Sequence, residues 1–323
     1  SGDKYAFQLV SSGTTGQFSF NTLSATLSDA GDNTTCEYAA TATGNMSGSE
    51  TNYTVIEGGA QPVSGNETQA GYQLPYSGTW SQLDVRVLLN SLSGATATTV
   101  RSRIAGANGN QVVTIANSTV GSFHDATNSD VVASNNSGLC FQIATASTVS
   151  GRINILKIES KIQSTSGNYS FINASASGVA GAIAKSTTLF YPIGGNANAN
   201  NATETNVQRT VRGAAISGTV IFANIFQNSL SVASTTIQSR KNAANGNLVL
   251  TIAAATTGSF SATSGDAYAL GDNINYTLVT GAGGIGTINP SVIAITAGLV
   301  TVVAVTFFQH SGPLRIYGRH GGR

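Results

Sequence analysis

The chain has 323 residues, of which 9% are charged, and a formal net charge of +1. This balance excludes a general nucleic-acid-binding surface, which needs clustered Lys and Arg, and the 41% of hydrophobic residues excludes a disordered chain. The length suffices for two domains of typical size. Because Ser, Thr, Asn and Gly replace charge on the surface, copies of the chain repel one another weakly.

One segment occurs twice. Residues 99–123 (TVRSRIAGANGNQVVTIANSTVGSF) and 236–260 (TIQSRKNAANGNLVLTIAAATTGSF) share 15 identities at a constant offset of 137. The triplet NSL recurs at 90–92 and 228–230, and FQIAT (141–145) matches YTLVT (276–280). A self-repeat of domain length predicts a tandem duplication.

The offsets predict the domain limits. TTGQFSF (14–20) matches TSGNYSF (165–171) at an offset of 151, so the first copy is expected to be 13 residues longer between residues 20 and 90. We therefore predict a first domain over 1–162, with a longer 21–89 region that forms a loop or small excursion. A second domain is predicted over 163–300, followed by a strand and a basic tail over 301–323.

The local pattern is that of strands. In chain order, β-branched and aromatic residues predict strands at 5–10, 83–89, 112–115, 153–158, 220–226, 248–252 and 276–279. Asn108-Gly109 and Asn245-Gly246 predict type I′ hairpin turns. No segment has the apolar period of a helix. The sequence predicts an all-β protein made of two tandem β-sandwich domains of the jelly-roll type.

The last apolar segment has two interpretations. From Ser291 to Phe308 the chain has 18 residues without a charge, which is the minimum for a membrane-spanning helix. Its Val, Ile and Thr content and the preceding Pro290 favour two buried strands instead. The second of these, from Leu299 to Phe308, would pair with the strand from Tyr5 to Val10 or be donated to a neighbouring subunit.

The sequence offers little reactive chemistry. There is no G-x-S-x-G motif, and none of the three histidines recurs in the other copy. We expect no enzyme, no catalytic residue and no cofactor. Asp125, Asn128 and Asp130 could offer oxygen ligands to calcium, although Asx turns are the commoner reason for such a cluster.

Three further features concern partners and modification. Cys36 and Cys140 could form a disulfide in an oxidising compartment, or they could be two buried free thiols. Trp80, with Tyr72 and Tyr76 nearby, could bind glycans, although buried core aromatics are the commoner case. The tail from Arg315 to Arg323 could be a solvated terminus, or it could contact a neighbouring subunit or an acidic partner, nucleic acid included. Ten sequons are candidate glycosylation sites, namely Asn33, Asn45, Asn52, Asn66, Asn117, Asn135, Asn168, Asn173, Asn201 and Asn275.

The stretch TTIQSRKNAANGNLVLTIAAATTGSF, followed by GDNINYTLVTGAG, resembles the repeated jelly-roll-like β-domains of virion, phage-appendage and extracellular-fibre proteins. The resemblance implies an assembly module, and it carries no functional residues with it. We expect a structural subunit at an extracellular or virion surface that assembles with copies of itself into a capsid or a filament. The alternative is a carbohydrate-binding adhesin or fibre-tip module.

Overall fold

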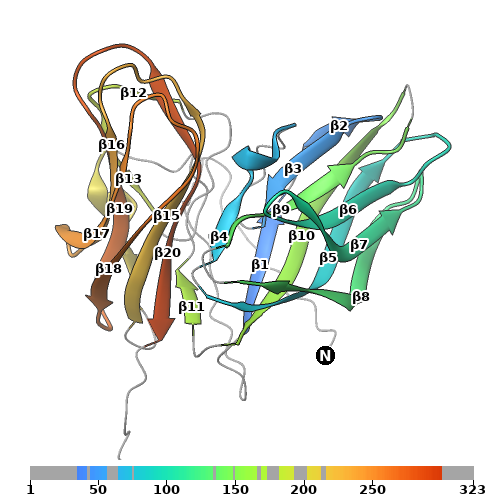
Figure 1. Cartoon of the computed structure of the whole chain (residues 1–323), viewed down its shortest axis with the longest axis horizontal. Helices are drawn as coiled ribbons and strands as arrows, with labels where there is room; N and C mark the ends of the chain where they lie inside the picture. Colours follow the sequence, from blue (N-terminus) through green and yellow to red (C-terminus); the bar gives the residue numbers. More distant parts are fainter. Residues whose placement is uncertain are drawn as a thin grey trace, which may run out of the picture.

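A computed structural model describes residues 35–41, 44–56, 65–74, 76–133, 136–147, 150–165, 169–172, 182–192, 202–211 and 216–299. These residues form four antiparallel sheets of five strands each and two short 3-10 helices, so the protein is all-β as predicted. Two sheets belong to the first repeat and two to the second, and Figure 1 shows the two pairs as separate bodies lying side by side.

The described residues of the first repeat form ten strands. One sheet has the order β1-β10-β5-β8, with β2 also paired to β10, and the other has the order β3-β9-β6-β7, with β4 also paired to β9. The elements are β1 (Thr35–Thr41), β2 (Asn45–Ser47), β3 (Thr51–Val55), η1 (Glu67–Gln69), β4 (Tyr72–Leu74), β5 (Gly78–Asn90), β6 (Thr98–Ile104), β7 (Ala107–Ile115), β8 (Gly121–Val132), β9 (Asn136–Ala144) and β10 (Arg152–Ser164).

The second repeat repeats this order strand by strand. Its sheets run β11-β20-β15-β18, with β12 paired to β20, and β13-β19-β16-β17, with β14 paired to β19. The elements are β11 (Tyr169–Ile172), β12 (Ile183–Ala184), β13 (Thr188–Tyr191), η3 (Glu204–Asn206), β14 (Arg209–Thr210), β15 (Ile216–Asn228), β16 (Thr235–Lys241), β17 (Ala244–Ile252), β18 (Gly258–Tyr268), β19 (Asn273–Thr280) and β20 (Thr287–Leu299).

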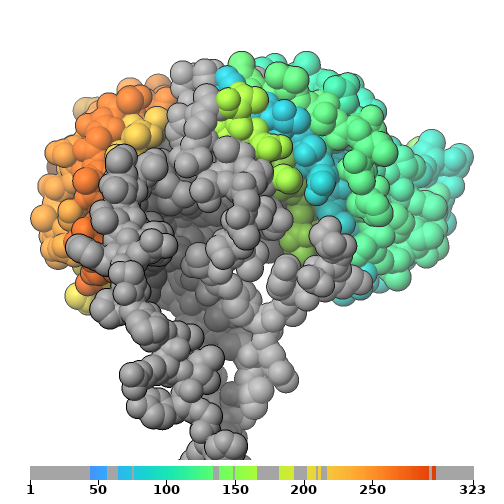
Figure 2. All heavy atoms as spheres, turned by 90° about the horizontal axis from the view of Figure 1, so that it is seen from below, coloured from blue at the N-terminus to red at the C-terminus, as the bar shows by residue number. Residues whose placement is uncertain are grey.

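Alternation along the strands builds the core. On β5, Leu83, Val85 and Val87 are buried while the intervening side chains are more exposed, as the two-residue period of a strand requires. The two sheets of the first repeat pack face to face, and the rings of Trp80 on β5 and Phe141 on β9 meet at 5.3 Å between centroids. The buried apolar residues form one cluster that extends through both repeats. From below, the two repeats appear as two rounded lobes (Figure 2).

The predicted hairpins form, but their turns lie three residues earlier. The β6–β7 turn is made by Ala105 (φ 49°) and Gly106 (φ 85°), and the β16–β17 turn by Asn242 (φ 49°) and Ala243 (φ 63°). Both central residues have positive φ, the requirement of a type I′ turn. The Asn-Gly pairs instead lie within β7 and β17.

The strand register also corrects the predicted 13-residue excess. β1 pairs with β10, and β11 pairs with the equivalent strand β20, so β11 takes the place of β1 and not of residues 14–20. The strands β2, β3 and β4 likewise have counterparts in β12, β13 and β14. Most of the 21–89 region that the structure describes is therefore shared framework, not an excursion of one copy. The strand β10 runs to Ser164, two residues past the predicted limit at 162.

Most of the predictions for the two ends of the chain fall on residues outside the described ranges. These are the strand from Tyr5 to Val10, residues 300–308 and the tail from Arg315 to Arg323. The described part of the 291–308 segment belongs to β20, which continues through Ala297-Gly298 without a turn. Among the described residues, no helix is long and apolar enough to cross a membrane.

Candidate functional site

An arginine–glutamate pair holds a 3-10 helix against a hairpin in both repeats. In the first repeat, Arg103 on β6 donates from Nε to Oε1 of Glu67 at 3.0 Å and from Nη2 to Oε2 at 2.7 Å. It also donates to the side chain of Asn108 and to the carbonyl of Gly106, at the turn of its own hairpin. The arginine thus ties η1 to the β6–β7 hairpin.

The second repeat reproduces this pair atom for atom. Arg240 donates to Glu204 at 2.9 Å and 2.8 Å, and also to Asn245 and to the carbonyl of Ala243. A ring stacks on each guanidinium, Tyr53 at 5.9 Å in the first repeat and Phe190 at 5.7 Å in the second. The hydrogen bond to the glutamate raises the pKa of each arginine, against the opposing effect of burial.

In each repeat a buried aspartate on the neighbouring strand, β8 or β18, accepts hydrogen bonds from the hairpin. Asp130 on β8 accepts from the hydroxyl of Ser102 at 2.6 Å and from the backbone N–H of Asn110 at 2.6 Å. In the second repeat Asp266 accepts from Ser239 and, at 2.7 Å, from the backbone N–H of Asn247. These bonds join β8 to the β6–β7 hairpin and β18 to the β16–β17 hairpin.

Glycine is required beside each aspartate. A Cβ built on Gly109 would lie 2.7 Å from Oδ2 of Asp130 and closer still to the hydroxyl of Ser102. The same clash arises at Gly246 with Ser239 and Asp266. The Asn-Gly pairs recur because of this close approach, not because they form the turn.

The recurring NSL triplet closes a loop in each repeat. The amide of Asn90 donates to the carbonyl of Ala116 and accepts from the backbone N–H of Leu92, both at 3.1 Å. Asn228 makes the same two bonds with Ala253 and Leu230. The recurring polar residues are therefore structural.

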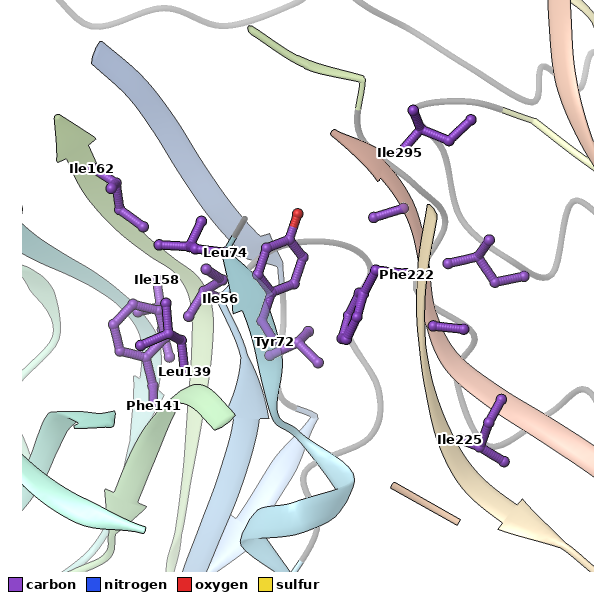
Figure 3. Close-up of a cluster of buried hydrophobic side chains, with 14 of the residues drawn as sticks. Ile56, Tyr72, Leu74, Leu139, Phe141, Ile158, Ile162, Phe222, Ile225 and Ile295 are labelled. Atoms are coloured by element: carbon purple, nitrogen blue, oxygen red, sulfur yellow. The ribbon is translucent and has the colours of Figure 1, made fainter. Parts of the chain in front are cut away.

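The two repeats meet where η1 and β4 of the first lie on β15 and β18 of the second. The rings of Tyr72 and Phe222 lie beside each other, tilted by 58° and with 5.4 Å between their centroids (Figure 3). Beside them Asn224, which is fully buried, donates to the carbonyl of Gly71 at 2.8 Å, to that of Thr68 at 3.1 Å and to the hydroxyl of Ser259. Gln69 donates to the carbonyl of Phe226 at 3.3 Å. This contact combines buried apolar area with satisfied polar groups.

The predicted calcium ligands take part in hydrogen bonds within the protein: Asp125 and Asp130 accept them, and Asn128 donates one to Asp125. All three lie in β8, not in a loop. Asp125 accepts from the backbone N–H groups of Val112, Thr127 and Asn128 and from the amide of Asn128. Burial opposes its ionisation, but these hydrogen bonds outweigh burial and hold the pKa of Asp125 well below its usual range. Among the described residues, no group of three His, Cys, Asp or Glu could hold a metal ion.

The predicted glycan-binding aromatics lie in the core. Trp80 is 0% exposed, and Tyr72 and Tyr76 are each 2% exposed. A sugar ring needs an open aromatic face, so these three cannot bind glycans from solution. The three aromatic rings instead fill space in the core between the sheets, and the ring of Tyr72 also packs at the contact between the repeats.

The predicted sequons divide by exposure. Asn45 and Asn66 are exposed, and Asn52 and Asn117 are partly buried. Asn66 also caps η1 by accepting from the backbone N–H of Thr68. Asn275 is fully buried in β19, so it cannot carry a glycan in the folded protein. The remaining candidates lie outside the described residues, namely Asn33, Asn135, Asn168, Asn173 and Asn201.

Cys140 is a buried free thiol, so of the two alternatives the disulfide with Cys36 is not formed here. Its sulfur lies 3.9 Å from Oε1 of Glu67, and burial together with that carboxylate raises the pKa of the thiol. Cys36 lies in β1, which belongs to the other sheet.

Sequence reasoning missed the glutamates and the contact between the repeats. Glu67-Thr68 and Glu204-Thr205 recur at the same offset of 137 as the hairpin, and so do Tyr53 and Phe190. Those short matches were the available signal. The chain matches no protein-family model and no curated protein.

Proposed function

We propose that this chain is a non-enzymatic structural subunit whose two repeats are jelly-roll sandwiches, and that it assembles with copies of itself into a virus capsid or an extracellular filament. The strand order carries this proposal. Without the short strands β2, β4, β12 and β14, eight strands remain in each repeat. Numbered along the chain, they give the sheet orders 1-8-3-6 and 2-7-4-5 in both repeats. That order agrees with two interleaved Greek keys, the plan of jelly rolls in capsid proteins.

The chemistry of the described residues supports the same proposal. The polar groups that recur between the repeats bind one another and stabilise the hairpins. Several large apolar side chains are exposed, including Leu88 (61%), Val131 (85%) and Ile285 (75%). Exposed apolar side chains on a surface with few charges favour association. An extracellular or virion-surface location fits the exposed sequons Asn45 and Asn66.

The test uses the full chain. Light scattering after size exclusion, over a wide range of protein concentration, should show association that increases with concentration, and negative-stain electron microscopy should show ordered shells or filaments. A protein that stays monomeric at every concentration and forms no ordered particle would overturn the proposal.

A further inference from the structure

The contact between the repeats joins two different surfaces, one from each repeat. The η1 end of the first repeat lies on the β15–β18 face of the second. Because the chain is a duplication, both surfaces exist a second time. The η3 end of the second repeat corresponds to the η1 end, and the β5–β8 face of the first repeat corresponds to the β15–β18 face. A head-to-tail contact of this kind can be continued from one chain to the next.

The η3 end is built in the same way as the η1 end. Arg240 and Glu204 hold η3 with the same two hydrogen bonds that hold η1. The difference lies at one position, because Gln69 of η1 is partly buried against β15 whereas its counterpart Asn206 is exposed; Thr68 and Thr205 are exposed in both repeats. The second repeat therefore presents an end of the same construction in which Asn206 is exposed.

The β5–β8 face has a hydrogen bond between neighbouring strands at the same position as the β15–β18 face. On the second repeat, Asn224 donates to Ser259 across the strands and to two carbonyls of the docking loop. On the first repeat, Arg86 occupies the place of Asn224 and donates from Nη1 to Ser122, the counterpart of Ser259, at 3.3 Å. Arg86 is exposed, and a guanidinium has five N–H donors, so it can also reach two loop carbonyls.

The register changes an aromatic pair into a pair of opposite charge. Tyr72 pairs with Leu139 on β9, and Arg209 pairs with the equivalent Ile274 on β19. Phe222 pairs with Ser261 on β18, and Asp84 pairs with the equivalent His124 on β8. Where Tyr72 meets Phe222 within the chain, the sequence thus supplies Arg209 and Asp84. Opposite charges at corresponding places give specificity for a second copy of this chain.

One apolar position is retained between the two faces, and a second apolar residue is present only on the β5–β8 face. Leu88 on β5 stands where the second repeat has Phe226, and its side chain is 61% exposed. Leu156 on β10, the neighbouring strand, is 43% exposed and stands where the second repeat has Ser291. Apolar area of this kind beside a charged pair is the composition of a reversible protein interface.

We propose that the η3 end of one chain docks on the β5–β8 face of the first repeat of another chain, repeating the contact that joins the two repeats within the chain. The inference rests on the proposed self-assembly and names its surface. Because the contact is head-to-tail, its rotation angle decides whether the product is a closed ring or an open filament.

Charge reversal tests the contact. Asp84→Arg and Arg209→Asp should each abolish assembly of the full chain, as seen by light scattering and negative-stain microscopy, and the double variant should restore it. Arg86→Glu should also abolish assembly. Glu50→Arg, which makes the same charge change as Asp84→Arg at an exposed position outside this face, serves as the control and should assemble like the wild type.

Three outcomes would count against the inference, each in a different way. If the wild type assembles and all of these variants assemble equally well, another surface mediates assembly, so this inference fails while the proposed function stands. If the wild type itself does not assemble, the proposed function fails first. If the single variants fail but the double variant is not restored while it unfolds at the wild-type temperature, the Asp84–Arg209 pairing is wrong.

Discussion

The guanidinium of Arg240 and the carboxylate of Glu204 meet side-on, with Nε 2.9 Å from Oε1 and Nη2 2.8 Å from Oε2. The two side chains are only 14% and 12% exposed, so water solvates neither charge well and each depends on the other for its stabilisation. The same pair in the first repeat, Arg103 with Glu67, holds the helix that contacts the second repeat. The pair therefore connects local structure with the arrangement of the repeats.

Replacing Arg240 with Met should destabilise the protein by about 2–3 kcal/mol, because Glu204 is left as a poorly solvated and unpaired carboxylate. The double variant Arg240→Met/Glu204→Gln should lose less than the single variant. Unfolding in guanidinium chloride measures both. Equal losses would show that the charge left on Glu204 is not the cause.

Gly246→Ala should cost about 1–3 kcal/mol, because the new methyl group collides with Ser239 and Asp266 and forces β17 away from β18. Gly265→Ala is the matched control. It lies on β18 of the same repeat, and its Cβ would meet nothing within 4 Å. If both substitutions have the same effect on the thermal midpoint, the close approach at Gly246 does not matter for stability.

The hairpins show how far sequence reasoning reaches. The repeated segment correctly predicted two hairpins and an all-β fold, since alternation and turn residues are local properties. It misplaced the turn because Asn108-Gly109 is a common turn pair, whereas the Gly109 conflict with Asp130 involves a residue 21 positions away. Long-range packing of this kind has no local signature.

The contacts of the candidate site were hidden for the same reason. Trp80 and Asn275 are chemically suited to binding and to glycosylation, and only the stacking of sheets shows that both are buried. The contact of Tyr72 with Phe222 joins residues 150 positions apart, one in each repeat, and Phe222 replaces a charged residue of the first copy. The replacement of a charged residue by Phe222 was therefore the signal for the contact between the repeats, whereas the comparison of the copies concentrated on the residues that they share.

Asp125→Asn should lower stability at neutral pH, because an amide presents N–H groups to donors that now bind a carboxylate. The pKa of Asp125 is lowered in the folded protein, so the stabilising effect of its charge is complete above the unfolded value of 3.8. It decreases as the pH falls below that value towards the folded pKa. Urea unfolding from pH 7 to pH 2 should therefore show the wild-type advantage shrinking below about pH 4. A constant difference at all pH values would contradict this assignment.

Asp84→Asn should have the opposite sign. Burial raises the pKa of Asp84, and the charge of Glu159 raises it further, while Lys157, His124 and Arg86 act against them. Ionisation of Asp84 therefore costs stability progressively as the pH rises above the unfolded value of 3.8, and the cost is complete above the folded pKa. The variant should unfold at a higher temperature than the wild type at pH 7 and at the same temperature near pH 3, measured at a concentration where the chain is dissociated. A lower midpoint at pH 7 would contradict the prediction.

Phe222→Ala should reveal whether the two repeats unfold together. The wild type is expected to unfold in one transition, because its buried apolar cluster continues from one repeat into the other. Removing the Phe222 ring should cost roughly 3–5 kcal/mol and weaken the link, so the two repeats should separate into two transitions in calorimetry.

The matched control is Phe141→Ala, which removes a ring that packs on Trp80 at 5.3 Å inside the first repeat. It should destabilise the first repeat without removing the contact between repeats. A double-mutant cycle of Phe222→Ala with Tyr72→Ala should give a coupling of about 0.5–1.5 kcal/mol, the range for a tilted aromatic pair. If the two effects simply add, the rings do not stabilise one another, and the hydrogen bonds of Asn224 to Gly71 and Thr68 must hold the repeats together.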